Sequence, residues 1–223
     1  DFIRRGSFDF VTMARKLLAD PELPRKLGEG RAAEIRPCIY CYTCISQIFV
    51  NEATKCAVNA RTGRENETVI VQAERSRRIM IAGGGPAGME TARVARLRGH
   101  QVILCEKSSR LGGTVRFSAT SYAPNAGLVR YLCGEMTRLG VEVRLCTELT
   151  AELVAREKPD EVVIAVGARR EVPAIPGIEL PHVLSGDDIR AMLTGESPNG
   201  SGPALGAVSR LLLGAGKGLG VLE

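Results

Sequence analysis

Four cysteines near the start of the chain have a spacing that suits a metal centre. The pattern is C-x2-C-x2-C-x11-C, and its members are Cys38, Cys41, Cys44 and Cys56. Three thiolates from one tight loop can bind three corners of a cubane while a distant fourth closes it, and this favours a [4Fe–4S] cluster. Tetrahedral zinc is the main alternative, although zinc ribbons usually place two CxxC pairs on either side of a long spacer. Unliganded buried thiols are disfavoured by the crowding.

A glycine-rich segment further along the chain has the spacing of a dinucleotide-binding loop. It follows the apolar run 79–82 and opens a predicted helix that ends near residue 98, the context that makes a GxGxxG pattern specific. Gly83 would permit the tight turn, Gly85 would let the backbone approach a pyrophosphate, and Gly88 would let the helix sit close to the sheet. The helix N-terminus would face the anion. The predicted binding residues of this loop are Gly83, Gly85, Pro86, Ala87 and Gly88.

A carboxylate stands at the end of the next predicted strand, residues 101–105. Glu106 is placed to accept hydrogen bonds from an adenosine ribose, and its charge would repel a 2′-phosphate. This first site should therefore hold FAD, ADP or NAD rather than NADP. The glycines that follow suit close approach to a flavin nucleotide, with ordinary turn formation as the alternative. The further predicted contacts are Lys107, Gly112, Gly113, Val166 and Gly167.

The other residues of reactive type have no predicted chemistry. Cys105, Cys133 and Cys146 each lie within a strand or helix pattern, where buried structural thiols are expected. His100 and His182 lie next to turns, which favours a solvated or packing role. No nucleophile–base pair is evident, so no catalytic residue is predicted.

Alternating apolar strands and amphipathic helices predict an α/β fold with a doubly wound parallel sheet, a Rossmann-like domain. A β-prone run at 8–13 and a helix at 14–19 precede it as a single βα unit. A complete (β/α)8 TIM barrel needs about 250 residues, so this unit would be the end of one. We expect three parts, namely the barrel end at 1–35, a cluster-binding linker at 36–74 and an FAD/ADP-binding domain at 75–223. The other expected elements are strands at 101–105, 141–145 and 161–166 (the last one buried), a helix at 128–139, a short helix after 188, a flexible connection at 196–203, a helix at 204–213 and a polar turn at 214–220.

Composition excludes several classes of protein. With 44% hydrophobic residues, the 223-residue chain can build a packed core. The net charge of +5 is spread along the chain, and 4% aromatics with no Trp disfavour a dedicated nucleic-acid binder. No apolar run approaches the roughly 20 residues that span a bilayer, and residues 1–9 do not form a signal peptide. Together with crowded, unpaired cysteines, this predicts a cytoplasmic protein that binds no membrane.

The barrel end, the cysteine linker and the dinucleotide-binding domain, in this order, resemble a known family. It is that of the NADH:flavin oxidoreductases, such as 2,4-dienoyl-CoA reductase and trimethylamine dehydrogenase, which join an old-yellow-enzyme barrel to a cluster and a flavin domain. The resemblance covers nearly the whole chain. It implies that Ala14 and Arg15, at the end of the last barrel strand, help to bind the FMN phosphate, whereas the plain alternative for Arg15 is a surface cation. The segments that carry the resemblance are 10–21 (FVTMARKLLADP), 36–41 (RPCIYC), 56–59 (CAVN), 63–65 (GRE) and 83–88.

The resemblance also implies a relay of electrons. NAD(P)H would give a hydride to FAD, the cluster would carry single electrons onward, and reduced FMN would reduce the activated double bond of an enoyl or dienoyl substrate. The rest of the barrel, with the catalytic acid, would precede residue 1, and a second Rossmann domain for NAD(P)H would follow residue 223. The chain alone is therefore expected to be inactive.

Two alternatives stay open at this point. Dienoyl-CoA reductases of the family have three residues between the second and third cysteine, whereas the amine dehydrogenases have two, as Cys41 and Cys44 do here. An amine dehydrogenase would carry ADP in place of FAD and send electrons outward to a flavoprotein. A stand-alone electron-transfer module is the other alternative. A homo-oligomer is compatible with each.

Overall fold

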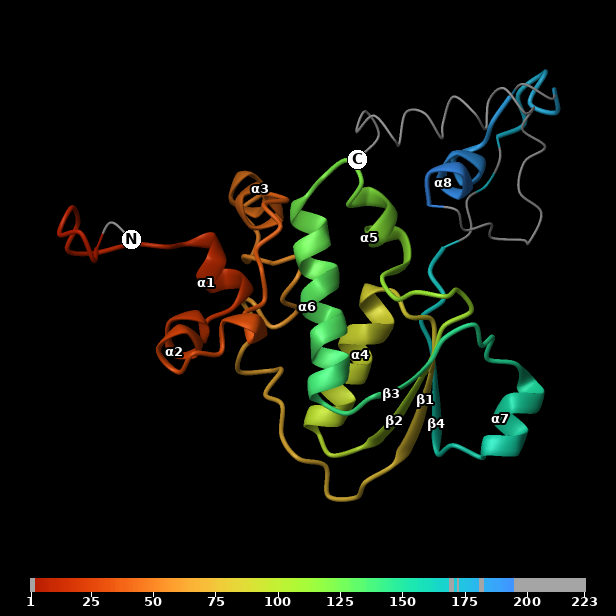
Figure 1. Ribbon diagram of the computed structural model, residues 1–223, viewed down its shortest axis with the longest axis horizontal. Helices are drawn as coiled ribbons and strands as arrows, with labels where there is room; N and C mark the ends of the chain where they lie inside the picture. Colours follow the sequence, from red (N-terminus) through yellow and green to blue (C-terminus); the bar gives the residue numbers. More distant parts are fainter. Residues whose placement is uncertain (1–2, 169–170, 172, 181–182, 195–223) are drawn as a thin grey trace.

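The computed structural model describes residues 3–168, 171, 173–180 and 183–194 (Figure 1). The predictions for 196–220 and for His182 lie outside these residues. Within the described residues, none of the helices combines the length and the apolar character needed to cross a bilayer.

A four-stranded parallel sheet with the order β3-β2-β1-β4 forms the centre of the fold. Ala82, the last residue of β1, pairs with Cys105 of β2 on one side and with Ile164 of β4 on the other. The strands therefore end at one common edge, and the predicted α/β class with a parallel, Rossmann-like sheet is confirmed. The strands are β1 (Arg78–Ala82), β2 (Gln101–Cys105), β3 (Glu142–Arg144) and β4 (Glu161–Ile164).

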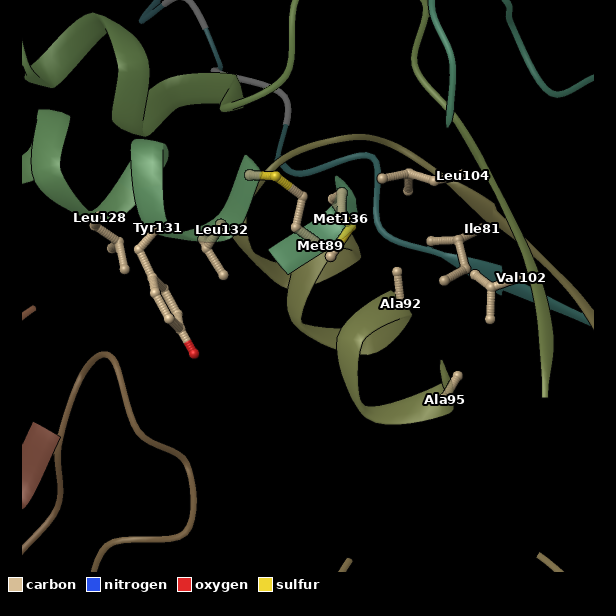
Figure 2. Close-up of a cluster of buried hydrophobic side chains, with 10 residues drawn as sticks. All are labelled: Ile81, Met89, Ala92, Ala95, Val102, Leu104, Leu128, Tyr131, Leu132 and Met136. Atoms are coloured by element: carbon tan, nitrogen blue, oxygen red, sulfur yellow. The ribbon is translucent and has the colours of Figure 1, made fainter. Parts of the chain in front are cut away.

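Two long helices cover one face of this sheet (Figure 1). They are α4 (Pro86–Leu97) and α6 (Pro124–Arg138), and α5 (Gly113–Ser118) packs beside α6. Figure 2 shows side chains of the sheet, α4 and α6 gathered into one buried cluster. Burying these side chains is the main stabilising term of the domain. The cluster contains Ile81, Met89, Ala92, Ala95, Val102, Leu104, Leu128, Tyr131, Leu132 and Met136.

The opposite face carries a smaller core under α7 (Ala151–Glu157). Thr150 caps this helix because its hydroxyl accepts a hydrogen bond from the N–H of Leu153 at 3.3 Å. The chain then continues through β4 to α8 (Gly186–Thr194), the short helix expected in this region. The smaller core contains Met80, Ile103, Cys105 and Leu153.

The N-terminal part contains short helices before the sheet begins. The predicted helix at 14–19 is present, whereas the predicted strand at 8–13 is wrong: the segment is irregular, and Phe10 and Val11 are largely exposed. β-Prone residues form a strand only where another strand supplies hydrogen-bond partners, and none does so within the described residues. The elements are α1 (Arg15–Ala19), α2 (Leu23–Gly28), the 3-10 turn η1 (Ala32–Glu34) and α3 (Thr43–Phe49).

Two predictions of burial also need correction. The strand expected to be buried at 161–166 ends at Ile164, whose side chain is 77% exposed, because β4 pairs only with β1 among the described strands. Cys146 is exposed in a turn with φ of +50°, whereas Cys133 is half-buried and Cys105 fully buried as expected. His100 has the expected packing role, since it is buried and its Nδ1 accepts the Arg77 N–H at 3.2 Å.

A buried arginine joins the cysteine segment to the Rossmann-like part. Arg36 is 7% exposed, and its guanidinium donates to the Val58 carbonyl and to Glu90 of α4, with Nη2 3.0 Å from Oε1. Its guanidinium carbon lies 5.5 Å from the centre of the Tyr131 ring of α6. Burial alone would raise the pKa of Glu90, but the hydrogen bond from Arg93 and the charge of Arg36 outweigh it and keep that pKa below its usual range.

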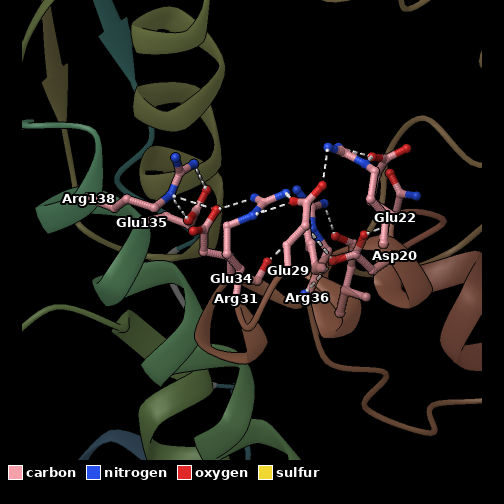
Figure 3. A network of polar contacts seen from close by, with 12 residues as sticks. Asp20, Glu22, Glu29, Arg31, Glu34, Arg36, Glu135 and Arg138 are labelled. Carbon is pink, nitrogen blue, oxygen red and sulfur yellow. Dashed lines mark hydrogen bonds and ion pairs between the residues drawn. The ribbon is translucent and has the colours of Figure 1, made fainter.

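Further polar contacts extend this joint on both sides (Figure 3). The buried carboxylate of Asp20 accepts the Arg36 N–H at 2.8 Å and the Lys26 ammonium at 2.7 Å. Towards α6, Glu34 lies 2.9 Å from Arg31 and 3.7 Å from Arg138. These ion pairs fix the segment before the cysteines against the helical face of the sheet.

We expect Arg36→Ala to lower the free energy of unfolding by about 3 kcal/mol, because it strands the Val58 carbonyl and removes one of two cations from a half-buried carboxylate. Glu90 has a lowered pKa, so its pairing stabilises the protein above the ordinary carboxyl pKa and is lost as the pH falls through the lowered value. The stability difference between the variant and the wild type should therefore shrink at acid pH, and the part that comes from the Val58 carbonyl should remain.

Urea unfolding measures this difference. Arg25→Ala is the matched control, because Arg25 forms its ion pair with Glu22 in solvent, and we expect little change there. Equal midpoints for Arg36→Ala and the wild type at neutral pH would show that the joint contributes nothing.

Candidate functional site

The glycine loop lies where β1 ends and α4 begins. The N–H of Gly83 donates to the Cys105 carbonyl at 2.8 Å, which holds the turn against the neighbouring strand. Gly83 has φ of +105°, a conformation that favours glycine. Gly85 is the N-cap of α4, and Pro86 occupies the first turn, where its missing N–H is of no consequence.

The space around each glycine shows whether it serves close packing of the backbone or leaves room for a ligand. A Cβ on Gly88 would lie 1.9 Å from the Gly83 carbonyl oxygen, and one on Gly83 would lie 2.4 Å from the Ala165 oxygen. A Cβ on Gly85 would meet no atom within 4 Å. Gly83 and Gly88 are therefore needed for the close approach of helix and strand, whereas Gly85 leaves open space at the helix N-terminus, where the backbone can receive an anion.

Glu106 has a second role that the sequence pattern did not reveal. Its carboxylate is 8% exposed, and Oε2 accepts the Gly84 N–H at 2.6 Å while Oε1 accepts the Ser108 N–H at 2.8 Å. Each oxygen retains a second lone pair that could serve a ribose. Glu106 therefore orders the glycine loop itself. The sequence could have indicated this contact, because the loop follows a strand that was expected to lie beside β2.

The other predicted nucleotide contacts gather around the same loop. The Gly112 N–H donates to the Gly84 carbonyl at 2.9 Å, and a Cβ on Gly113 would lie 3.1 Å from the Gly85 Cα. Val166 and Gly167 directly follow Ala165, which touches the loop, and Val166 is largely exposed. Lys107 is also exposed. The structure therefore brings these segments together, and their binding roles stay predictions.

The loop that carries Cys38, Cys41 and Cys44, here called the cysteine loop, shows contacts that suit thiolate ligands. The Tyr40 N–H points to the Cys38 sulfur at 3.4 Å, and the Thr43 hydroxyl lies 3.3 Å from the Cys41 sulfur. Burial would raise the pKa of Cys41, but hydrogen bonds from Thr43 and from backbone N–H groups, including that of Ala57, lower it overall. Because Ala57 follows Cys56, the segment of the fourth cysteine lies beside the Cys41 sulfur.

The four cysteines are free thiols, so their donor set fits an iron–sulfur cluster. In the part of the chain that the structure describes, no three His, Cys, Asp or Glu side chains converge closely enough to hold a metal ion. The donor type and the N–H···S contacts favour the cluster, the positions of the side chains do not form a closed site, and the cluster stays a prediction.

Ala14 and Arg15 lie at the start of α1, next to the cysteine loop. With Met13, Lys16 and Tyr40 they line a hollow of about 300 Å³. The Arg15 guanidinium also packs on the ring of Tyr42, 4.7 Å from its centre. The predicted FMN-phosphate role of the two residues is untested.

A parallel sheet with a glycine loop at its carboxyl edge and a helix N-terminus beyond it is the arrangement of a Rossmann-type dinucleotide-binding fold. Residues 77–216 match the family model of pyridine nucleotide-disulphide oxidoreductases. The chain belongs to this family, and its relatives also confirm the resemblance to flavin oxidoreductases of the old-yellow-enzyme type.

Two of the relatives that are similar in sequence illustrate the match. The bilirubin reductase of Mediterraneibacter gnavus is 38% identical over 82% of this chain and 29% of its own length. The NADH oxidase of Thermoanaerobacter brockii is 42% identical over 79% of this chain and 28% of its own length. The chain thus spans less than a third of the length of these relatives.

Two of the solved structures that are similar in fold illustrate the match. A 2-naphthoyl-CoA reductase complex matches with a TM-score of 0.77 and 36% identity, covering 80% of this chain and 28% of its own. The histamine dehydrogenase of Rhizobium sp. 4-9 matches with a TM-score of 0.72 and 31% identity, covering 78% of this chain and 26% of its own. Both a reductase and an amine dehydrogenase therefore share this arrangement.

The two glycines at the start of α4 should respond differently to substitution. Gly88→Ala places a methyl group against backbone that cannot move aside, and we expect a loss of about 3 kcal/mol or more in unfolding free energy. Gly85→Ala meets open space, so we expect a loss of at most about 1 kcal/mol, because alanine is a poorer N-cap than glycine. Thermal unfolding without nucleotide measures both, and equal losses in the two variants would contradict the assigned packing.

Proposed function

We propose that this chain is the cluster- and nucleotide-binding part of an FMN/[4Fe–4S]/FAD oxidoreductase. In it, electrons pass from NAD(P)H through FAD and the cluster to FMN, for the reduction of an α,β-unsaturated enoyl or dienoyl substrate. The observation that carries this proposal is the joint at Arg36, which attaches the cysteine segment to α4, the helix that begins at the glycine loop. The two candidate cofactor sites therefore belong to one folded unit.

The nucleotide side rests on the chain's own backbone. The first N–H groups of α4 and the open side of Gly85 can receive a pyrophosphate, and the free lone pairs of Glu106 can accept hydrogen bonds from a ribose. The same carboxylate disfavours a nucleotide with a 2′-phosphate. FAD in this position would exchange a hydride for single electrons.

The cysteine side supplies four thiolates, from Cys38, Cys41, Cys44 and Cys56. Backbone and hydroxyl donors around Cys41 stabilise the charged sulfur that ligation needs. Zinc remains the rival ion for the same donor set. The protein's part here is to hold these sulfurs in the loop whose Tyr42 packs on Arg15, one of the two proposed FMN-phosphate residues.

The relatives support the reaction class. They include a bilirubin reductase, a 2-naphthoyl-CoA reductase and an NADH oxidase, in agreement with NAD(P)H as donor and an unsaturated compound as acceptor. The second candidate function is an amine dehydrogenase with bound ADP, favoured by the two-residue spacing of Cys41 and Cys44 and by the match to histamine dehydrogenase. A stand-alone electron-transfer module is the third. Coding sequence upstream of residue 1 discriminates it, because seven further βα units would be required for a barrel.

We expect the chain, reconstituted anaerobically with iron and sulfide, to bind four of each, with absorbance at about 400 nm from thiolate-bound iron. Cys41→Ser should abolish this uptake. Cys146→Ser is the matched control, because Cys146 is an exposed thiol that the proposal leaves unliganded. Stoichiometric zinc in the purified protein with no uptake of iron would replace the cluster by a zinc site.

We expect FAD or ADP to bind at the glycine loop, with Glu106→Gln weakening binding by about 1–3 kcal/mol through loss of charged hydrogen bonds. Gly85→Val should weaken it strongly, because the side chain occupies the open space. Isothermal titration calorimetry with each nucleotide measures this and also separates the two candidate functions by which nucleotide binds more tightly. Glu142→Gln, an exposed carboxylate on β3, is the control. Unchanged affinity in both variants would place the nucleotide elsewhere.

A further inference from the structure

Two tyrosines of the cysteine loop have a backbone conformation that bulky residues rarely adopt. Tyr40 has φ of +53° and Tyr42 has φ of +60°, in the left-handed region that glycine and asparagine accept most readily. Such a conformation costs free energy and persists where the surroundings hold it. The contacts of these two side chains therefore show what the strained backbone serves.

Both rings pack on one cation at the start of α1. The guanidinium carbon of Arg15 lies 4.7 Å from the centre of the Tyr42 ring and 5.3 Å from that of Tyr40, within the range of cation–π attraction. This attraction acts on the charge of the guanidinium and leaves it N–H donors for an oxygen acceptor. The two rings therefore restrict where Arg15 lies while it can still bind an anion.

The Arg15 guanidinium has an unused donor. Its Nη1 atom is buried and has no hydrogen-bond partner among the described residues. A buried N–H group without a partner is costly, because it has lost its contact with water and gained no acceptor. A phosphate would supply acceptors, since its oxygens match the fork of a guanidinium.

The hollow beside this arginine is suited to an anion. Arg15 lines it together with a second cation, Lys16, and its other lining residues are Met13, Ala14 and Tyr40. Within the described residues, neither cation forms an ion pair with a carboxylate. Two positive charges from successive residues of α1, with no acidic side chain in the lining, favour a doubly charged group such as a phosphate monoester.

We propose that Tyr40 and Tyr42 are positioning residues that hold Arg15 for the phosphate of FMN, and that Lys16 is a further binding residue for the same phosphate. A free arginine samples many rotamers, so holding it in place lowers the entropy that is lost when the phosphate binds. The strain of the cysteine loop then serves ligand binding rather than the stability of the fold. The inference rests on the proposed function, in which Arg15 binds this phosphate, and it requires no metal at the cysteines.

The experiment is a titration of the chain with FMN at low ionic strength, followed by flavin fluorescence, with riboflavin as the matched ligand that lacks the phosphate. We expect the chain to prefer FMN, and Arg15→Gln to lower that preference about tenfold or more, because it removes hydrogen bonds to a charged group. Lys16→Gln should lower it less, because lysine acts as a flexible point charge. An unchanged preference in Lys16→Gln would remove Lys16 from the site.

The role of the two rings is tested separately from the stability of the fold. Asparagine accepts left-handed backbone and has no ring, so Tyr40→Asn combined with Tyr42→Asn should lower the preference for FMN about fivefold, while the melting temperature stays the same or rises. Tyr40→Phe combined with Tyr42→Phe keeps both rings and should keep the preference. Arg25→Gln is the control for general attraction of the anion, because it removes the same charge from an exposed site on α2.

The outcomes separate this inference from the proposed function, whose iron uptake and nucleotide binding have titrations of their own. A wild-type chain without a preference for FMN overturns the phosphate role of Arg15, and this inference with it. A preference that is lost in Arg15→Gln but kept in the asparagine pair overturns the positioning role alone, and an equal loss in Arg25→Gln overturns the inference as well. If the asparagine pair does not fold, Tyr42→Leu decides: a kept preference overturns the positioning role, and a lowered one supports it.

Discussion

A guanidinium withdrawn from water must be paired, and the pairing of Arg36 determines how the two halves of this chain meet. Its partners come from three places, namely the Val58 carbonyl, the Glu90 carboxylate of α4 and the ring of Tyr131 on α6. Loss of the charged partner would leave a buried guanidinium unpaired, which costs a large amount of folding free energy. Arg36 stands two residues before Cys38, so satisfying this one charge also places the cysteine loop.

The same constraint orients the N-terminal helices. The backbone N–H of Arg36 is held by Asp20, which also binds Lys26, and Glu34 continues the contacts to Arg138 on α6 (Figure 3). These segments are too short to form a large core of their own, so polar contacts take over the task of positioning. The consequence for function is that one helix, α4, presents the glycine loop at its start and receives the cysteine segment at Glu90.

The sequence predicted the parts whose physics is local. The glycine loop, the strand before it and the strand 101–105 follow from steric limits on Gly83 and Gly88 and from apolar runs, and the structure has them where expected. The failures concern partners distant in the chain. Among the described residues, the run at 8–13 has no neighbouring strand and β4 has one on a single side, so propensity alone misjudged both. The contact of Arg15 with two tyrosines likewise depends on tertiary structure and on a strained backbone.

In the proposed function, this chain holds a cluster and a flavin nucleotide as one electron-transfer unit. The most direct measurement is flash photoreduction of the flavin in a chain loaded with both FAD and the iron–sulfur cluster, following the arrival of the electron at the cluster over a range of protein concentrations. We expect a rate that is independent of protein concentration and that falls in Arg36→Ala, where the joint is lost. A rate that rises in proportion to concentration would show transfer between separate molecules and would contradict it.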